Sequence, residues 1–392
     1  MKRVWFLDLL RAIAISAVVL FHCLPVAQGQ GFFSDILARL VESLWWGVDL
    51  FFVLSGYLIT TLLWETRSAS NRVTVFLVRR VLRIFPLYFT WLAIVFAFNA
   101  AVPRESISAL RPYVPYFATY TTNFWILANH SWFPTDRLNH LWSLAVEEQF
   151  YLLWPFAVFF LRRTQLITVT FSAIVLMQLL KLWLLATGVA VPVAYTFFLT
   201  RADSLLCGAV AAFAVLWWKP SRKAQTGAAC VFISAFLVAF GIAGWKGFSI
   251  GSVTASIGTS ALAWLFASAI SLVLREDRTF QMPVWFAKLV SGVVALSYGA
   301  YLSHWIVWQA LNDFLPSFHL AHPIVRFLTA VTSIAAVSTT LYFLVERPFL
   351  MLKPAYKIGP GSRVPDALPQ EAPADALVSV RANTPFISRP SL

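Results

Sequence analysis

Residues 44–64 read LWWGVDLFFVLSGYLITTLLW, and this stretch decides the fold class. Its only charged side chain is Asp49. A transmembrane helix needs about 20 consecutive, predominantly apolar residues. The stretch therefore predicts a membrane span. Because a spanning segment must satisfy its backbone hydrogen bonds internally, we expect this span to be a helix.

Further apolar runs of similar length follow along the chain. Of its 392 residues, 59% are hydrophobic and 12% are charged, whereas soluble domains carry about 25% charged residues. We therefore expect an all-α, polytopic membrane helix bundle of about ten transmembrane helices, which form one domain over residues 1–350. The expected spans are Val4–Leu24, Leu44–Trp64, Ile84–Val102, Leu141–Leu161, Leu166–Leu185, Leu205–Trp218, Ala228–Ala243, Val253–Leu274, Leu289–Phe314 and Ile324–Val345.

Basic residues in the connecting loops indicate the orientation of the bundle. If the N-terminus is inside, the inner segments up to the last span hold 15 Lys and Arg residues and the outer loops hold six. The sequence therefore predicts cytoplasmic N- and C-termini and a multi-pass protein of the cell inner (plasma) membrane. The same bias accounts for much of the net charge of +13, so we expect no nucleic-acid partner.

The last part of the chain has a different composition. From residue 351 onward it is rich in Pro, Ala, Ser and charged residues, which predicts a disordered cytoplasmic tail over residues 351–392. The three cysteines are Cys23, Cys207 and Cys230, and they fall in or beside the expected spans. Their spacing fits neither a metal site nor a disulfide framework, so we expect no metal.

Ionisable groups inside a span are costly and indicate function. Arg11 and His22 are eleven residues apart, so they share a helix face about 16 Å apart along the axis. Asp8 lies one turn before Arg11 and is placed to pair with it. This common face favours a polar path through the bundle over the alternative, in which each side chain merely reaches its nearer membrane interface.

Asp49 is expected at the depth of His22. A carboxylate beside an imidazole orients a general base, so the two are predicted to act together; the alternative is a helix-capping Asp. Three arginines, Arg79, Arg80 and Arg83, precede the third span. They form a candidate phosphate clamp, although ordinary membrane anchoring explains them as well.

The fourth span opens with a polar helix face. His140, Glu147 and Tyr151 share that face, and two adjacent carboxylates, Glu147 and Glu148, are hard to explain by packing alone. The alternative is a buried ion pair with an arginine of another helix.

Three smaller groups of polar residues complete the candidates. Tyr301 and His304 share a face of the ninth span, where a site and a packing seam are equally good interpretations. Arg201 and Asp203, at an outer helix start, either contact a ligand or pair with other residues. Lys181 is expected to extend toward the interface.

Together, these segments resemble the acyltransferase-3 family of integral-membrane O-acyltransferases. The resemblance runs from Phe6 to Pro348, and the order and spacing of the motifs make it specific. The matching segments are Arg11 to His22 as an Arg–ten residues–His motif, Gly47–Tyr57, Arg80–Arg83, Trp142–Tyr151, Arg201–Asp203, Tyr301–His304 and Val345–Phe349.

The resemblance implies a ten-helix fold and transfer of an acyl group, commonly acetyl, from cytoplasmic acyl-CoA (acetyl-CoA) as co-substrate. The implied acceptor is a hydroxyl of a cell-envelope or exported glycan, or of a lipid-linked saccharide. Arg11 and His22 are the residues that the family marks as essential. His22 is expected either to take the proton of the acceptor hydroxyl or to accept the acyl group covalently, and the sequence does not separate the two roles. With them we expect Asp49 and Glu147 in catalysis. The three arginines Arg79, Arg80 and Arg83 are expected to bind the donor. The residues expected to bind substrate are His140, Tyr151, Arg201, Asp203, Tyr301 and His304.

Two other function classes fit part of the pattern. A membrane transporter or flippase of a glycan or lipid precursor also needs polar residues on facing helices. Its typical Gly- and Pro-interrupted spans in two corresponding halves are not evident here. An acyl-modified sensor without turnover is the third possibility. Transfer or hydrolysis of acyl-CoA by purified protein separates the three.

Overall fold

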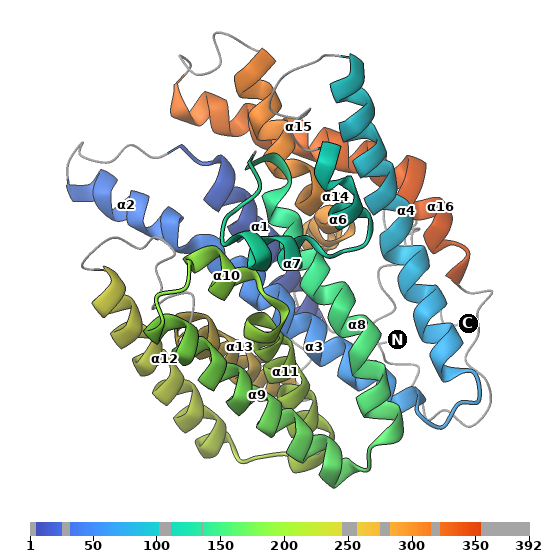
Figure 1. The fold of residues 1–392 in the computed structure, drawn as a ribbon, viewed down its shortest axis with the longest axis vertical. Helices are drawn as coiled ribbons and strands as arrows, with labels where there is room; N and C mark the ends of the chain where they lie inside the picture. Colours follow the sequence, from blue (N-terminus) through green and yellow to red (C-terminus); the bar gives the residue numbers. More distant parts are fainter. Residues whose placement is uncertain are drawn as a thin grey trace, which may run out of the picture.

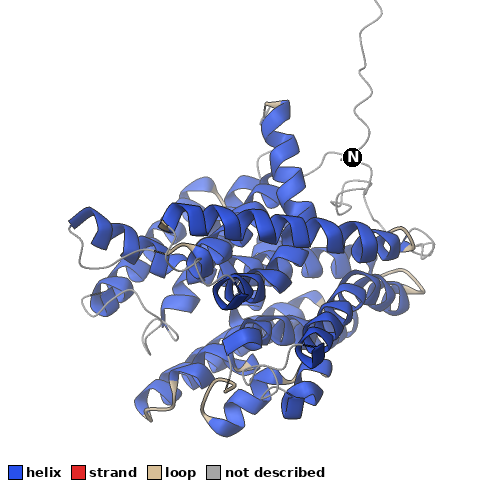
Figure 2. Ribbon diagram, turned by 90° about the horizontal axis from the view of Figure 1, so that it is seen from above, coloured by secondary structure: helices blue, strands red, loops and turns tan. Residues whose placement is uncertain are grey.

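The computed structural model describes residues 5–25, 32–101, 111–134, 136–244, 257–274, 283–314 and 322–353. Within these ranges all regular elements are helices and no strand occurs, which confirms the all-α prediction (Figure 2). In chain order the elements are α1 (Trp5–Cys23), α2 (Phe32–Ser43), η1 (Leu44–Trp46), α3 (Gly47–Thr66), α4 (Arg72–Ala101), η2 (Arg111–Tyr113), α6 (Val114–Ala118), α7 (Thr122–Asn129), η3 (Asp136–Leu141), α8 (Trp142–Phe160), α9 (Arg163–Ala186), α10 (Val191–Thr196), α11 (Phe198–Phe213), η4 (Ala214–Trp218), α12 (Arg222–Gly244), α13 (Thr259–Leu274), α14 (Val284–Phe314), α15 (Pro323–Leu341), η6 (Tyr342–Glu346) and α16 (Arg347–Leu350).

Each predicted span coincides at least in part with a helix. Seven helical stretches of the described residues are long and apolar enough to cross a membrane. Helices α8, α12 and α13 are not among the seven; α13 has only 16 residues, and α8 carries the polar run Glu147-Glu148-Gln149. The structure thus supports a multi-pass protein, and the number ten stays a prediction. The expected tail lies outside the described residues from position 354 onward.

The helices form two groups joined by a central set (Figure 1). In one group, α9 and α13 pack against α11, and α12 packs against α13. In the other, α14 packs against α15, and α4 lies against η6 and α16. Helices α1, α3 and α8 connect them, because α1 contacts α14 as well as α3, and α3 contacts α8 and α11.

Two glycines allow the close crossing of α3 and α11. A Cβ at Gly56 would lie 1.8 Å from the carbonyl oxygen of Leu205, and a Cβ at Gly208 would lie 2.1 Å from that of Val53. Small residues of this kind let helix backbones approach closely in membranes, where packing drives helix association. The two backbones therefore touch along the centre of the bundle.

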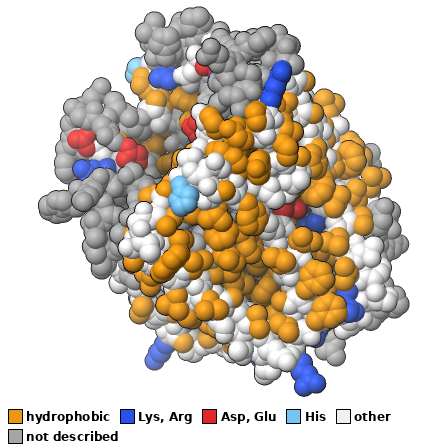
Figure 3. All heavy atoms as spheres, viewed as in Figure 1, with side chains coloured by type: hydrophobic (Ala, Val, Ile, Leu, Met, Phe, Trp, Pro, Cys, Tyr) orange, Lys and Arg blue, Asp and Glu red, His pale blue; other side chains and the backbone are white. Residues whose placement is uncertain are grey.

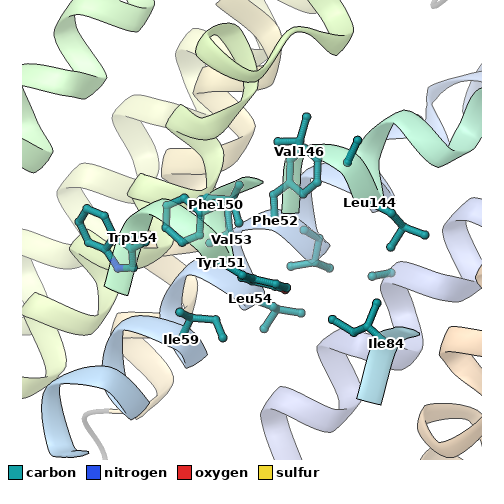
Figure 4. Close-up of a cluster of buried hydrophobic side chains, with 14 of the residues drawn as sticks. Phe52, Val53, Leu54, Ile59, Ile84, Leu144, Val146, Phe150, Tyr151 and Trp154 are labelled. Carbon is teal, nitrogen blue, oxygen red and sulfur yellow. The ribbon is translucent and has the colours of Figure 1, made fainter. Parts of the chain in front are cut away.

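Aromatic and aliphatic side chains fill the space between α3 and α8. Phe52 and Ile59 of α3 lie with Phe150 and Trp154 of α8 in one buried cluster (Figure 4). The indole nitrogen of Trp154 donates to the hydroxyl of Thr60 over 2.8 Å, so even the polar atom of this large ring is satisfied. This packing fixes the height of α8 relative to α3, and with it the height of Glu147.

The surface of α9 is apolar while its inner face is polar. Val175, Leu176 and Trp183 are more than half exposed, whereas Lys181 is fully buried. Such a distribution suits a helix with lipid on its outer side. The expectation that Lys181 extends to the interface is therefore wrong, because the ammonium group bonds to Asp203 inside the bundle. Figure 3 shows one face of the molecule, on which apolar side chains predominate.

Short helices between the spans were not predicted. Of these, α7 packs against α8, where the amide of Gln149 bonds to Asn123 of α7 and donates to the carbonyl of Tyr120, between α6 and α7, over 2.8 Å. Tyr88 of α4 donates to the carbonyl of Phe117 over 2.9 Å. The segment 111–134 is thus tied to both α4 and α8.

Candidate active site

Three histidines from distant parts of the chain meet at one end of the bundle. The ring centroids of His22 and His304 are 4.8 Å apart, and those of His304 and His140 are 5.1 Å apart. His22 ends α1, His140 lies in η3 just before α8, and His304 lies in the middle of α14. We call these three residues the histidine cluster. The sequence predicted all three as site residues but did not indicate that they touch.

Backbone carbonyls hold one nitrogen of each ring. The Nδ1 of His22 lies 2.9 Å from the carbonyl oxygen of Val18, and the Nδ1 of His304 lies 2.8 Å from that of Tyr301. The Nε2 of His140 lies 3.3 Å from the carbonyl of Leu302. A carbonyl only accepts, so the nitrogen beside it carries the proton. In each neutral ring the other nitrogen is then left as a bare acceptor.

Asp49 does not orient His22, which corrects the predicted pairing. Its Oδ1 accepts from the guanidinium of Arg201 over 2.8 Å and from the hydroxyl of Ser204 over 3.3 Å. Both Asp49 and Arg201 are fully buried. Asp49 can lie at the expected depth and still form this pair. The charged Arg201 of α11 is a stronger partner for its carboxylate than the neutral imidazole of His22.

A second polar cluster surrounds Glu147, which lies on α8 seven residues after His140. Ser55 and Tyr151 donate to its two carboxylate oxygens over 3.0 Å and 2.9 Å. The guanidinium of Arg80 lies 5.4 Å from the centre of the Tyr151 ring, and both Arg80 and Arg11 interact electrostatically with Glu147. We call Ser55, Arg80, Glu147 and Tyr151 the carboxylate cluster. Sequence reasoning missed Ser55, although it lies within the Gly47–Tyr57 motif.

The two clusters are joined by α1, α8 and α14. Arg11 is at the carboxylate-cluster end of α1, where it also forms the predicted pair with Asp8 at 4.0 Å, and His22 is at the other end. On α8, Ser143 bonds to Tyr301 of α14 between the two clusters. The spacing of eleven residues on α1 corresponds to about 16 Å. The site is therefore a polar column that runs along the helices inside an apolar bundle.

The predicted phosphate clamp lies on α4, next to the carboxylate cluster. Arg79, Arg80 and Arg83 are all partly buried. Arg80 faces Tyr151, and Arg83 interacts electrostatically with Tyr298 of α14. Of the three, Arg80 and Arg83 thus reach toward the bundle, where a ligand that enters the column from this end would meet them.

The six predicted substrate-binding residues do not form one site. His140, Tyr301 and His304 lie together near His22, and the Tyr301 hydroxyl donates to the carbonyl of His140 over 3.2 Å. Tyr151 belongs to the carboxylate cluster. The remaining two, Arg201 and Asp203, belong to buried ion pairs.

Those ion pairs connect four helices. Lys181 of α9 lies 2.6 Å from Asp203 of α11, and Ser260 of α13 donates to the same carboxylate over 2.7 Å. Arg201 of α11 binds Asp49 of α3 and lies 4.9 Å from the centre of the Tyr195 ring. For Arg201 and Asp203, the structure favours the pairing interpretation over direct contact with a ligand. Only the Arg-Ala-Asp motif indicated these pairs in the sequence.

In the described parts of the chain, no group of three or more His, Cys, Asp and Glu side chains has the geometry to hold a metal ion. The histidine cluster is a set of imidazoles in ring-to-ring contact.

The acyltransferase domain family model matches residues 4–343. Among curated proteins, the chain is similar to the peptidoglycan O-acetyltransferase OatA of Listeria monocytogenes, with 37% identity over 170 residues, which cover 41% of this chain and 25% of that protein. It is also similar to the O-acetyltransferase OatA of Staphylococcus aureus, with 28% identity over 318 residues, which cover 72% of this chain and 50% of that protein.

The matches cover only part of those relatives. The chain spans about half the length of the Staphylococcus aureus protein and a quarter of the Listeria monocytogenes protein. No solved structure matches the chain. The family match agrees with the enzyme interpretation of the polar column.

Proposed function

The chain belongs to the acyltransferase-3 family and is an acyltransferase, and from this premise we propose that it moves an acyl group, commonly acetyl, from cytoplasmic acyl-CoA to a hydroxyl of a cell-envelope or exported glycan. The observation that carries the proposal is the polar column between the carboxylate cluster and the histidine cluster. A chain that transfers a group between a donor on one side of the membrane and an acceptor on the other needs such a path through its helices.

The donor enters at the carboxylate-cluster end in this proposal. Coenzyme A is polyphosphorylated, and planar guanidinium groups bind phosphate in two-pronged geometry. Arg79, Arg80 and Arg83 lie at this end, which the excess of basic residues in the connecting loops assigns to the cytoplasm. The flexible arm of the donor then extends along the column, past Arg11, toward His22.

Acyl transfer takes place at His22. Its Nδ1 proton is held by the Val18 carbonyl, so its Nε2 is free to accept the proton of the acceptor hydroxyl. The hydroxyl oxygen forms a bond to the thioester carbonyl carbon, the carbon–sulfur bond breaks, and the proton on His22 passes to the departing thiolate. The products are an ester and free coenzyme A, so no further reactant is needed.

The names of the relatives support a glycan acceptor. One is a peptidoglycan O-acetyltransferase, and both are O-acetyltransferases. An acceptor of this kind lies outside the cytoplasm, which fits a base at the end of α1 remote from Arg11. We propose peptidoglycan as the first acceptor to test.

The test is acyl transfer by the full chain, purified and inserted into lipid nanodiscs. With labelled acetyl-CoA and envelope glycan, the wild type should acetylate the glycan. Loss of general-base help costs about 10²–10⁴-fold, so His22→Ala should retain at most about 1% of the rate. The control is His130→Asn, because His130 is exposed at the end of α7 and its left-handed backbone suits asparagine.

Two results would contradict the proposal. A wild-type protein that transfers nothing from acetyl-CoA to any envelope glycan would exclude the donor or the acceptor class. Turnover near the wild-type rate in His22→Ala, at matched protein levels, would remove His22 from the chemistry and leave His304 as the next candidate.

A further inference from the structure

Two bare imidazole nitrogens beside His22 are the feature from which we draw a further inference. We propose that His140 and His304 bind the acceptor saccharide by accepting a hydrogen bond from a second donor, an O–H or N–H group next to the hydroxyl that reacts at His22. This inference rests on the proposed function and specifies the chemistry of its acceptor site.

Two nitrogen atoms of the described histidine cluster lack a protein donor. Within the described parts of the chain, neither the Nδ1 of His140 nor the Nε2 of His304 has a hydrogen-bond partner, and both atoms are buried. His304 has no exposed surface, and His140 has 8%. A buried acceptor without a donor costs free energy, so two of them in one site favour a ligand that brings hydrogen-bond donors.

Two protein donors close to the histidine cluster, on Tyr301 and Trp305, are already used. The Tyr301 hydroxyl bonds to the carbonyl of His140 and to Ser143. The indole nitrogen of Trp305, whose ring centroid lies 5.0 Å from that of His22, donates to the carbonyl of Asp136 over 2.9 Å. Both donors thus bond to oxygen atoms and not to the free imidazole nitrogens of His140 and His304.

The acceptor nitrogens of the histidine cluster restrict the chemistry of a ligand that binds there. A ligand for this site must bring hydrogen-bond donors, and it must bring at least two, one for His22 and one for its neighbours. A saccharide meets this requirement, because hydroxyl or amide groups stand on adjacent carbons of its ring. A simple alcohol has only the one donor that reacts, and an anion without protons has none.

The contact between the rings gives the site a further property. His304 touches both other histidines, and all three interact electrostatically with one another. Like charges at this separation repel each other strongly in a medium of low dielectric constant. The neutral, accepting form of His140 and His304 is therefore compatible with a proton on His22 during transfer, whereas charged neighbours would oppose it.

The test compares variants that keep or remove an acceptor atom. His304→Gln places an amide oxygen near the position of Nε2, and His304→Leu places none. For His140, whose free atom is Nδ1, the pair is His140→Asn and His140→Leu. His130→Asn serves as the control, since His130 is exposed and its left-handed backbone, with φ of 54°, suits asparagine.

The steady-state KM is measured for acetyl-CoA and for glycan released from the source envelope by muramidase. Loss of one hydrogen bond, with its partner left unpaired, should raise the acceptor KM of both leucine variants at least about tenfold. The amide variants should stay within about threefold of the wild type. The KM for acetyl-CoA should not change in any variant, because the donor binds from the other end of the column.

Each other outcome contradicts the inference. An unchanged acceptor KM in both leucine variants excludes acceptor binding. A fall in kcat alone, with the acceptor KM retained, assigns the two residues to chemistry or structure. A change confined to acetyl-CoA hydrolysis shows that water is the ligand. If His304→Leu does not accumulate, the His140 pair decides. If the wild type transfers no acyl group at all, the proposed function itself is wrong. That result differs from every outcome above, in which the wild type is active.

Discussion

At the scale of single residues, the buried pair of Asp49 and Arg201 carries the sharpest consequence. Both side chains have no exposed surface, and their charges are 2.8 Å apart. Removal of one partner from a buried ion pair costs about 3–5 kcal/mol, because the other charge is left uncompensated. Asp49→Asn should therefore lower the unfolding temperature of the purified protein and its yield, not only its turnover.

The matched test is the double variant. Arg201→Met alone leaves a buried carboxylate and should be as damaging as Asp49→Asn. When the two are combined no net charge is buried, and thermal unfolding in detergent should return most of the way to the wild type. If Asp49→Asn has wild-type stability and loses only activity, Asp49 acts on the site and the ion pair is dispensable.

The arginines of α4 give a second prediction at this scale. Arg80→Ala and Arg83→Ala should raise the KM for acetyl-CoA with a smaller effect on kcat, because a phosphate clamp acts mainly in binding. Lysine should restore the binding only in part, since it lacks the planar fork. The control is Arg163→Ala: Arg163 is exposed, lies on α9, and stacks on Trp217 away from the column. Donor KM values that match this control would return the α4 arginines to membrane anchoring.

At the scale of elements, the crossing of α3 and α11 is fixed by backbone contact. An added methyl group at Gly56 or Gly208 would overlap the carbonyl oxygen of the opposite helix, and backbone cannot move aside without separating the helices. Gly56→Ala and Gly208→Ala should therefore each reduce stability and also disturb the pair of Asp49 and Arg201, which joins the same two helices. Thermal unfolding of the purified variants measures this effect.

The control for these variants is Gly227→Ala. Gly227 lies in α12, and nothing is within 4 Å of a Cβ at that position. Because alanine favours a helix more than glycine by about 1 kcal/mol, this variant should be neutral or slightly more stable. Equal stability of all three variants would show that the two central helices are not packed as closely as described.

Periodicity and motifs predicted the helices well but not their partners. The apolar runs locate the spans, since length and composition alone decide whether a segment fits the bilayer. They carry no information on which helices touch. The predicted partner of Asp49 was therefore wrong, and the burial of Lys181 was not predicted. Both errors have one cause: the sequence shows that a charge lies in a span, while its counter-charge comes from a helix more than 20 residues away.

The candidate site was predicted in its residues more than in its arrangement. His22, His140 and His304 were each identified from helix faces or motifs, and the contact among them depends on how α1, α8 and α14 cross. The electrostatic interaction of Arg11 with Glu147 likewise joins α1 and α8. Such contacts are set by tertiary packing, which a single sequence without an internal repeat does not specify.

At the scale of the whole molecule, the polar column requires one orientation in the membrane. The donor is cytoplasmic in the proposed function, so the carboxylate cluster must face inward and the histidine cluster outward. The loop between α3 and α4 lies at the carboxylate-cluster end of the column. It ends at Arg72, the first residue of α4, only about two helical turns before Arg80 of that cluster. The excess of 15 basic residues over six predicts the same orientation independently.

Reporter fusions test this orientation directly. A fusion at Ser70, between α3 and α4, and one after Lys353 should report a cytoplasmic location, whereas a fusion at Ser108 should report the outside. Alkaline phosphatase, active only outside, and a fluorescent protein that folds only inside give opposite signals at each site and so control for expression. A phosphatase signal at Ser70 would place the α4 arginines away from cytoplasmic acyl-CoA. The donor would then have to enter at the histidine cluster, and the direction of transfer proposed for the column would be reversed.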